Sequence, residues 1–468
     1  MTADSSMPPG AEPLSAKGRR VPLSLISIYC LPTVGAGFMY LLVALYLMKF
    51  ATDVLGISPA AMGTIFGLSR IWDAISDPVV GYWSDRTHTR MGRRRPWILA
   101  SIVPIFAAYL MLWSPPADLS GDALLVWVTV GVFGFYTAMT VFAVPHLSLG
   151  AELTRDHHDR SRIFGIRHIG WTLGSVTALA GMGLLIGAEH EGAAEVRSVA
   201  RELALGVAIV TAVMLAIPAL RLRERADFQD RGPRNPYAAF RDVLTNVHAR
   251  LLIAVTFVEH LGSATMSVVT LYIAQYVIGM PELAPLFILS YMIPSIVSVP
   301  MWLPIARRFG KKQLWIFSLL LTGFSFGSMF FLGEGDVVMI CVLAAFAGLA
   351  AGAGGTLAPS VQADVIDVDE YQTGERKEGA YFATWNFVYK SSTGIMLMVT
   401  GFVLEFSGFV PNAPQTEEVK LALRSLFALF PMVCYVVGAL ILSRFALTET
   451  EHARIRRELE ARRPVSKH

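Results

Sequence analysis

Two acidic residues lie four positions apart inside a long apolar segment that reads Arg70-Ile-Trp-Asp73-Ala-Ile-Ser-Asp77-Pro78. On a helix, positions 73 and 77 share one face. An ionised group in the middle of a membrane costs about 2.5 to 3.5 kcal/mol on insertion scales, and two such groups side by side repel each other. A cation bound between the carboxylates would remove both penalties, so we predict a cation site at Asp73 and Asp77.

Hydroxyl and carbonyl oxygens near this pair complete the ligands that Na⁺ prefers. Ser76 lies between the two acids, and Thr140 lies in another apolar segment. Pro78 has no N–H, which leaves a carbonyl one turn earlier free. Alternatively, the carboxylates share one proton, because neighbouring acids resist being ionised together, or Asp73 pairs with Arg70 and Asp77 braces a loop. We expect a coupling ion, Na⁺ or H⁺, and no other cofactor.

A lysine occurs near the middle of a later apolar segment, in Tyr389-Lys390-Ser391-Ser392. Its side chain would have to stretch to reach either membrane surface, so we expect it to meet an acid inside the protein. If Lys390 exchanges with the cation at Asp73 or Asp77, it couples ion binding to transport. The alternative is a purely structural ion pair.

Other polar and aromatic residues in apolar segments are candidates for binding a solute. Glu259 and the neighbouring His260 could line a cavity or form an interhelical hydrogen bond, and Arg167 could reach the cavity or extend to the membrane surface. Trp385, Asn386 and Trp171 add the ring faces and amides that bind sugars. Tryptophans of an interfacial belt would produce the same pattern without a ligand.

The composition requires lipid around these residues. The chain has 468 residues, of which 54% are hydrophobic and 16% are charged, and a membrane-spanning helix needs roughly 20 apolar residues. We predict an all-α membrane protein of about twelve helices, over residues 23–49, 59–83, 96–114, 123–148, 164–187, 203–220, 250–277, 282–304, 313–332, 337–358, 379–406 and 422–446. The first of these segments is too long for a signal peptide.

Positive charge alternates between the predicted loops. Loops 51–58, 114–122, 280–283 and 333–336 contain no Lys or Arg. The even-numbered loops are basic and contain Arg86, Arg90, Arg93, Arg94 and Arg95, then Arg155, Arg160 and Arg162, then Arg307, Arg308, Lys311 and Lys312. By the positive-inside rule, the basic loops and both termini lie on the cytoplasmic side of a bacterial inner membrane. We divide the chain into an N-terminal tail (1–22), a six-helix half (23–220), a cytoplasmic linker (221–249), a second six-helix half (250–446) and a C-terminal tail (447–468).

Several function classes do not fit. The net charge of +3 is spread over short loops, which argues against nucleic acid as a partner. Cys30, Cys341 and Cys434 lie singly in apolar runs without metal-ligand spacing. We predict that the protein is not an enzyme, because candidates such as His146 and Ser148 lack a third orienting group.

Several motifs together resemble the glycoside-pentoside-hexuronide:cation symporters, the melibiose-permease branch of the major facilitator superfamily. They are the 70–78 segment above, Thr87-His-Thr-Arg90-Met-Gly92-Arg-Arg-Arg95-Pro96-Trp97, Thr52-Asp53-Val54, Val144-Pro145 and Ala363-Asp364-Val-Ile-Asp367. The resemblance covers nearly the whole chain. It implies the two-half fold of that superfamily, a Na⁺, Li⁺ or H⁺ site at Asp73, Asp77 and Thr140, a coupling role for Lys390, and Arg167 as the family's fifth-helix arginine.

Two positions depart from this family. Its galactoside binders have acids on the first and fourth helices, where this chain has Gly37 and Ala143. A galactoside held in the family's usual manner is therefore not expected, although another glycoside or a sugar acid could use Arg167, Lys390, His146 or Glu259. Related symporters carry lysolipids, so that substrate class stays open.

We therefore expect a monomeric symporter that imports a small organic solute by alternating access. The substrate would be a glycoside, sugar or sugar acid, or alternatively a lysolipid or another amphipathic solute. A non-transporting membrane sensor on the same fold is the alternative from a different class.

Overall fold

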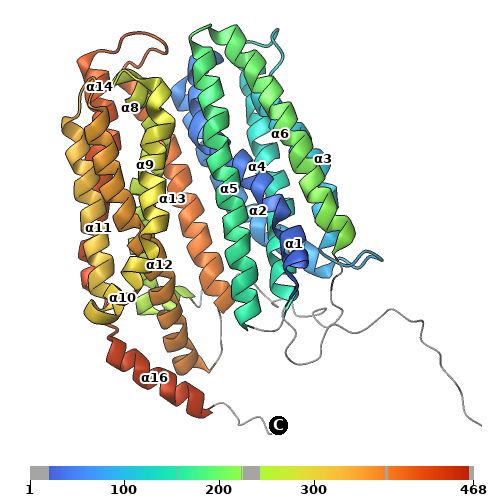
Figure 1. The fold of residues 1–468 in the computed structure, drawn as a ribbon, viewed down its shortest axis with the longest axis vertical. Helices are drawn as coiled ribbons and strands as arrows, with labels where there is room; N and C mark the ends of the chain where they lie inside the picture. The colour runs from blue at the N-terminus through green and yellow to red at the C-terminus, as the bar shows by residue number, and fades with distance from the viewer. Residues whose placement is uncertain (1–20, 155–156, 223, 225–242, 375–377, 463–468) are drawn as a thin grey trace, which may run out of the picture.

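The structure is a computed structural model that describes residues 21–154, 157–222, 224, 243–374 and 378–462. These residues are helical apart from short turns and loops, and the one β-bridge among them joins Thr89 and Gly92. The helices form two bundles that lie side by side (Figure 1). The linker predicted at 221–249 lies largely outside the described residues.

The first bundle contains the helices that precede the linker. They are α1 (Leu23–Lys49), the π-helical turn η1 (Phe50–Val54), α2 (Pro59–Arg86), α3 (Arg95–Trp113), α4 (Gly121–Glu152), α5 (His157–Glu189) and α6 (Ala193–Arg221). Helix α1 packs on α5, and α3 packs on α4 and α6.

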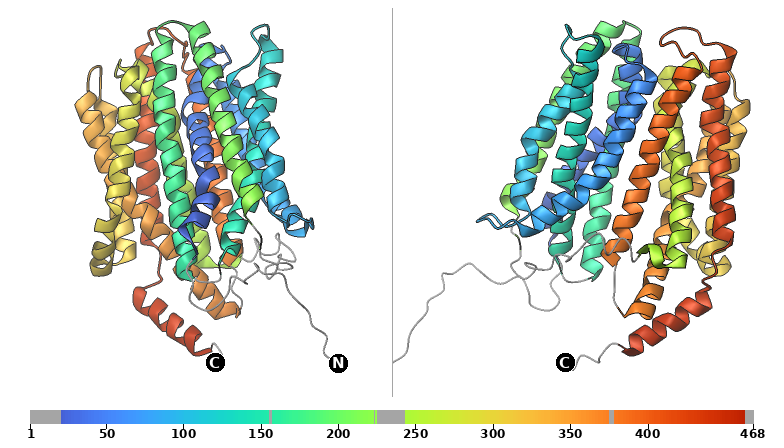
Figure 2. Two further views of the ribbon diagram at one scale, coloured as in Figure 1. Left: turned by 45° about the vertical axis from the view of Figure 1, so that its right-hand side comes forward. Right: turned by 180° about the vertical axis from the view of Figure 1, so that it is seen from behind.

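The second bundle follows the linker and ends in a short outer helix. Its elements are α8 (Val247–Tyr276), η3 (Pro281–Leu283), α9 (Ala284–Val297), α10 (Val299–Phe309), α11 (Lys311–Ser328), η4 (Met329–Phe331), α12 (Val337–Thr373), α13 (Glu378–Phe406), α14 (Glu417–Arg424), η5 (Ser425–Leu429), α15 (Phe430–Ser443) and α16 (Glu449–Arg462). Helix α16 lies across one end of this bundle, on the side of the C-terminus (Figure 2).

Ten helices in the described residues are long and apolar enough to cross a membrane. Helices α9 and α10 form an eleventh span with a bend of 41°, which Pro294, Pro300 and Pro304 promote by removing backbone donors. Helix α2 is the twelfth long helix, and Arg70, Asp73 and Asp77 make it more polar than the others. The predicted all-α, twelve-helix class is confirmed.

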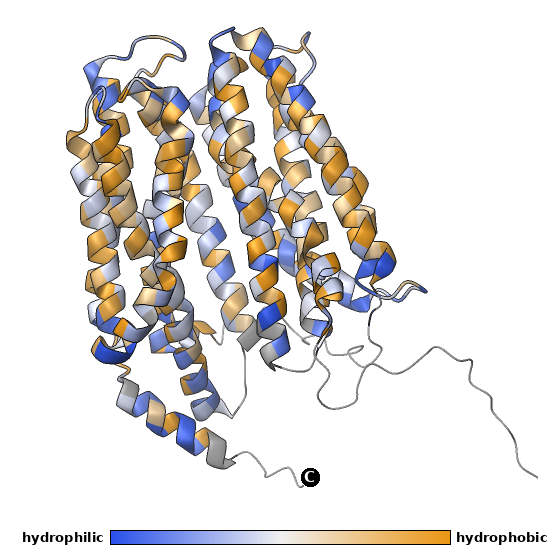
Figure 3. Ribbon diagram, in the orientation of Figure 1, coloured by the Kyte–Doolittle hydropathy of each residue, from blue (hydrophilic) through white to orange (hydrophobic). Residues whose placement is uncertain are grey.

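Several predicted boundaries are wrong because helices continue past their apolar stretch. Helix α12 extends to Thr373 instead of 358, α5 begins at His157 instead of 164, and α6 begins at Ala193 instead of 203. Hydropathy indicates only the part of a helix that lies in lipid. The helix itself continues into polar residues for as long as its backbone hydrogen bonds continue. Apolar residues predominate along the helices of both bundles (Figure 3), and Leu184, Val213 and Phe324 are more than half exposed, as lipid-facing residues are.

Glutamate 224 fixes the loop between α2 and α3. Its carboxylate accepts hydrogen bonds at 2.8 Å from the backbone N–H groups of Arg93, Arg94 and Arg95. These donors lie at the start of α3, where they have no partner within the helix, and a negative charge there is favoured by the helix dipole. The residues that follow α6 are therefore joined to the basic loop after α2.

Glycines bring α2 and α13 together across the two bundles. A Cβ atom at Gly67 would lie 3.0 Å from the Gly394 carbonyl oxygen, and one at Gly394 would lie 2.7 Å from the Cβ of Arg70. Gly63 and Gly401 approach each other in the same way, with 2.9 Å between a Cβ at Gly401 and the Gly63 Cα. Small residues spaced by one turn allow such close backbone packing in membranes, and this contact places Asp73 and Asp77 opposite α13.

Candidate cation and solute site

Lys390 of α13 lies between the two acids of α2. Its ammonium nitrogen is 2.8 Å from Asp73 Oδ2 and 2.6 Å from Asp77 Oδ2. Asp73 is 1% exposed, Asp77 20% and Lys390 16%, so the three charges are largely shielded from solvent. The bridge connects an acid pair of the first bundle to a base of the second.

Oxygen atoms predicted as cation ligands converge on the same point. The Thr140 hydroxyl of α4 donates to Asp73 Oδ1 at 2.7 Å and lies 3.0 Å from Asp77 Oδ1. The Ser76 hydroxyl instead donates to the Asp73 backbone carbonyl at 3.1 Å. The structure therefore brings Thr140 to both carboxylates, whereas Ser76 bonds to its own helix.

Arg70 supplies a second positive charge beside Asp73. Its guanidinium is 3.9 Å from Asp73 Oδ2, donates to the Tyr136 hydroxyl at 2.7 Å and lies over the Tyr136 ring. The alternative of an Arg70–Asp73 pair therefore coexists with the Lys390 bridge. Two positive and two negative side chains balance in this cluster, which explains how it is stable inside an apolar bundle. Tyr136 was not predicted, because a tyrosine in an apolar helix gives no local signal of its partner.

Asn386 contacts this cluster. Its amide donates to Asp77 Oδ2 at 3.3 Å, because it lies one turn before Lys390 on the same face of α13. The side chain is exposed, and its substrate-binding role stays a prediction.

Arg167 and Trp171 lie one turn apart on α5. Arg167 is half-buried, and its Nε has no hydrogen-bond partner among the described residues. Trp171 lies 5.4 Å from the ring of Tyr40, which in turn lies 6.2 Å from the ring of Tyr136. An aromatic path thus connects the predicted solute residues of α5 with the cation cluster.

The space beside Gly37 is filled by the backbone of α5, and no acidic side chain fits there. A Cβ atom at this position would collide with the backbone carbonyl of Trp171. The first-helix acid of the galactoside binders is therefore absent for a steric reason, because α1 and α5 are in backbone contact here. Ala143 is half-buried on α4.

Glu259 lies within the second bundle, between α8, α11 and α12. Its Oε1 and the Ser318 hydroxyl oxygen are each 3.7 Å from a Cβ built at Gly354. The neighbouring His260 contacts the Thr256 carbonyl and the Tyr389 ring. Glu259 therefore lies close to the Lys390 helix without joining the cation cluster.

Two predicted solute residues are packed inside the protein. His146 is fully buried, stacks on Tyr29 at 4.4 Å and has its Nε2 2.8 Å from the Tyr29 carbonyl oxygen. Trp385 is 5% exposed and packs against Tyr381 and Phe382. Neither side chain is open to a solute in this arrangement, since α1 covers His146 and two rings of α13 itself pack against Trp385, and both substrate-binding roles stay predictions.

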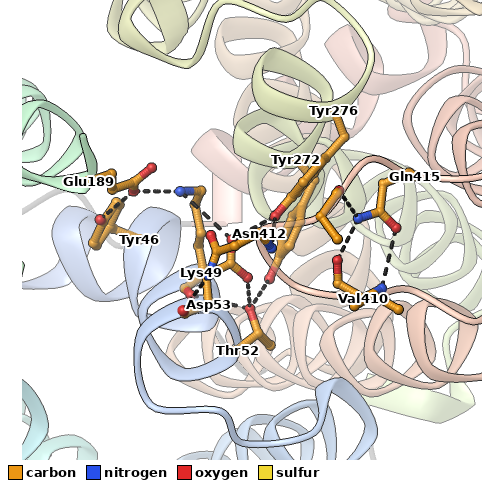
Figure 4. Close-up of polar contacts among 11 residues, drawn as sticks. Tyr46, Lys49, Thr52, Asp53, Glu189, Tyr272, Tyr276, Val410, Asn412 and Gln415 are labelled. Atoms are coloured by element: carbon orange, nitrogen blue, oxygen red, sulfur yellow. Dashed lines mark hydrogen bonds and ion pairs between the residues drawn. The ribbon is translucent and has the colours of Figure 1, made fainter. Parts of the chain in front are cut away.

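A second polar cluster joins the bundles at the end opposite the C-terminus (Figure 4). Asp53 accepts a hydrogen bond from the Tyr276 hydroxyl at 3.0 Å, and Thr52 lies 3.1 Å from the Tyr272 hydroxyl. Asn412 donates to the Asp53 carbonyl at 2.7 Å. The bundles are thus closed at the end predicted to face outward.

Lys49 anchors this cluster on the first bundle. It pairs with Glu189 and lies 3.9 Å from Asp53, while Tyr46 donates to Glu189 at 2.6 Å. We did not predict these contacts from the sequence. Lys49 and Asp53 are four residues apart at the end of an apolar run, which could have signalled a buried pair.

Comparisons with known proteins find transporters that are similar to this chain over nearly its whole length. A family model described as MFS/sugar transport protein matches residues 28–449. The chain is 28% identical to the isoprimeverose transporter of Lactiplantibacillus pentosus, over 96% of this chain and 94% of that protein. It is 25% identical to the glucuronide carrier protein homolog of Escherichia coli K12, over 93% and 95%.

A relative with a different cargo and a solved structure complete the comparison. The sodium-dependent lysophosphatidylcholine symporter 1 of Xenopus tropicalis is 27% identical, over 97% of this chain and 93% of that protein. A crystal structure of a D-xylose-proton symporter superimposes with a TM-score of 0.64 at 14% identity, over 92% of this chain and 99% of that one. At this identity the superposition shows the fold alone.

Proposed function

The chain belongs to the MFS/sugar transport protein family of membrane transporters, and from that premise we propose that it is a cation-coupled symporter that imports a sugar, glycoside or sugar acid by alternating access. The relatives named above are symporters and sugar transporters, and none is an enzyme. The coupling ion is Na⁺ or H⁺. The protein works as a monomer in a bacterial inner membrane with both termini in the cytoplasm.

The Lys390 bridge to Asp73 and Asp77 carries this proposal. A cation that binds between the carboxylates competes with the ammonium group for the same oxygens. Lys390 belongs to the second bundle and the acids to the first, so displacement of the lysine removes a contact between the bundles. Ion binding then changes the relative stability of the two bundle arrangements, which is the physical requirement for coupling.

A solute with an acidic or hydroxyl-rich group suits the remaining polar residues. Arg167 offers guanidinium donors, Trp171 and Tyr40 offer ring faces, and Glu259 offers a carboxyl group on the other bundle. No acid is present at Gly37 or Ala143. A sugar acid is therefore favoured over a neutral galactoside.

A lysolipid is the second candidate substrate. The 27% identity to a sodium-dependent lysophosphatidylcholine symporter over nearly the whole chain favours it. A thermal-shift screen of the purified protein against sugars, sugar acids and lysolipids, with and without Na⁺, separates the two classes, because a ligand stabilises the protein that binds it.

Uptake into proteoliposomes tests the proposal directly. Under an imposed Na⁺ or H⁺ gradient, the wild type and Asp118→Asn, an exposed loop control, should accumulate the solute found in the screen. Asp73→Asn and Asp77→Asn should lose concentrative uptake. Full uptake by both variants would refute the ion site. If the wild-type protein accumulates no solute under a Na⁺ gradient or under a H⁺ gradient, the protein is a sensor and not a symporter.

A further inference from the structure

A separate cavity lies at the end of the second bundle that carries the C-terminus. It has a volume of about 510 Å³ and is enclosed by the turn between α10 and α11, by α12 near Asp364, and by the segment that leads into α16. Neither the cation cluster nor the polar cluster at the opposite end contributes to its lining.

The lining of this cavity is strongly basic. Arg307, Arg308, Lys311 and Lys312 line it, and Asp364 is the one carboxylate residue among its lining residues. Both lysines are engaged, since Lys311 bonds Asp364 at 2.7 Å and Lys312 donates to the carbonyl groups of Ser443 and Phe445. The cavity therefore has more positive charge than its own acid neutralises.

The two arginines are not paired with acids. Among the described residues neither Arg307 nor Arg308 has a carboxylate within ion-pair distance, and the guanidinium of Arg308 lies 5.4 Å from the Phe309 ring. A guanidinium is suited to bidentate contact with phosphate oxygens. Two adjacent guanidiniums without an acid partner in the described part of the chain are therefore suited to hold a phosphate group.

The surroundings indicate a lipid as the source of this phosphate. Phe309, directly after the two arginines, is 60% exposed, and it ends a membrane-spanning helix where headgroups and acyl chains meet. Basic pockets between helices on the predicted cytoplasmic side bind anionic headgroups. We propose that this cavity binds the headgroup phosphate of an anionic phospholipid through Arg307 and Arg308.

Helix α16 forms the outer wall of the site. His452 lines the cavity and lies 3.1 Å from Asp367 of α12, and Tyr371 donates to Glu458 at 2.7 Å. Ile455 and Leu459 pack on Val368. A lipid bound here contacts α10, α12 and α16 together, so it holds the C-terminal helix against the second bundle.

Thermal unfolding of the full-length protein in detergent tests this site, with phosphatidylglycerol, phosphatidylcholine or inorganic phosphate added. Phosphatidylglycerol should raise the midpoint temperature of unfolding, and phosphatidylcholine should leave it unchanged. In the double variant Arg307→Gln/Arg308→Gln, the half-saturating amount of phosphatidylglycerol should rise about tenfold or more, because two charge-assisted contacts are lost. The charge-matched control Arg90→Gln/Arg250→Gln, at exposed positions, should respond like wild type.

Three results would overturn the assignment. They are an unchanged lipid response in Arg307→Gln/Arg308→Gln, an equal response to phosphatidylcholine, and a full response to inorganic phosphate to which the lipid adds nothing. If the double variant does not fold, Arg307→Lys/Arg308→Lys keeps the charge but loses the bidentate geometry, and it should still require several-fold more phosphatidylglycerol than wild type.

Discussion

Lys390 occupies the position that we propose for the coupling ion. Its ammonium group lies between Asp73 and Asp77, which avoids leaving two like charges without a counter-charge in the membrane. Under the proposed coupling, a metal ion or proton that enters the site displaces this group. In that proposal the lysine competes with the ion as well as balancing the charge of the acids.

Removal of the Lys390 ammonium group should change the affinity of the site for the coupling cation. In Lys390→Met, we expect the affinity for the coupling cation to rise about tenfold, because the carboxylates lose their internal partner. Active transport should fall, because the empty carrier then keeps only Arg70, 3.9 Å from Asp73, to balance two acids. Calorimetric titration with Na⁺ measures the affinity, and an unchanged or weaker affinity at every pH would contradict the exchange.

A substitution at Gly37 tests whether steric collision excludes an acidic side chain from this position. Gly37→Asp introduces the acid of the galactoside binders, but its Cβ would collide with the Trp171 carbonyl. We expect loss of roughly 2 kcal/mol or more of stability by overpacking, and no galactoside binding. Gly206→Ala, where a Cβ meets open space, is the control. A stable Gly37→Asp protein that binds melibiose would show that the position is free.

At the scale of elements, the contact of α2 with α13 controls how closely the bundles approach. Their glycines leave no room for side chains at Gly63, Gly67, Gly394 and Gly401. A larger residue there should separate the helices and lengthen the Lys390 bridge without replacing a charged residue.

Gly394→Val should therefore lower the transport rate by roughly tenfold or more, because it forces Arg70 and the Gly67 backbone away. The rate is measured as initial uptake in proteoliposomes at matched protein content. Gly355→Ala, where nothing lies within 4 Å of a new Cβ, should transport at the wild-type rate. Wild-type uptake by Gly394→Val would indicate that this helix contact is not needed for transport.

At the scale of the whole molecule, the proposed alternating access makes this structure one of two bundle arrangements. The cluster of Asp53, Thr52, Tyr272, Tyr276 and Asn412 joins the bundles at the end opposite the C-terminus. Alternating access requires these contacts to break when the other end closes.

Asp53→Ala removes the acceptor of the Tyr276 hydroxyl and the partner of Lys49. We expect this variant to favour the outward-open arrangement, so that a cysteine introduced on an outward-facing wall of α8 reacts several-fold faster with a membrane-impermeant thiol reagent. Glu191→Gln, an exposed change on the same end of the molecule, should leave the rate unchanged. An unchanged rate in Asp53→Ala would show that the other contacts suffice.

The residues that could be predicted are those whose type conflicts with their apolar surroundings. Asp73, Asp77 and Lys390 are costly in lipid, so their presence alone indicated a site. Tyr136, Glu189 and Tyr272 were missed because their role comes from partners distant in the chain. His146 was assigned to the solute for its chemistry, whereas its contact with Tyr29 could not be read from a linear pattern.

The amino-acid sequence by itself determined the membrane class, the number of helices, the alternation of charged loops and the presence of two acids one turn apart in an apolar segment, because hydropathy and charge act locally along the chain. The tertiary structure decided which partner each buried charge has. It also decided where helices end beyond the apolar stretch, that Gly37 has no space for an acid, and that Arg307 and Arg308 have no acid partner among the described residues. These features depend on distances between segments far apart in the chain, and packing alone sets those distances.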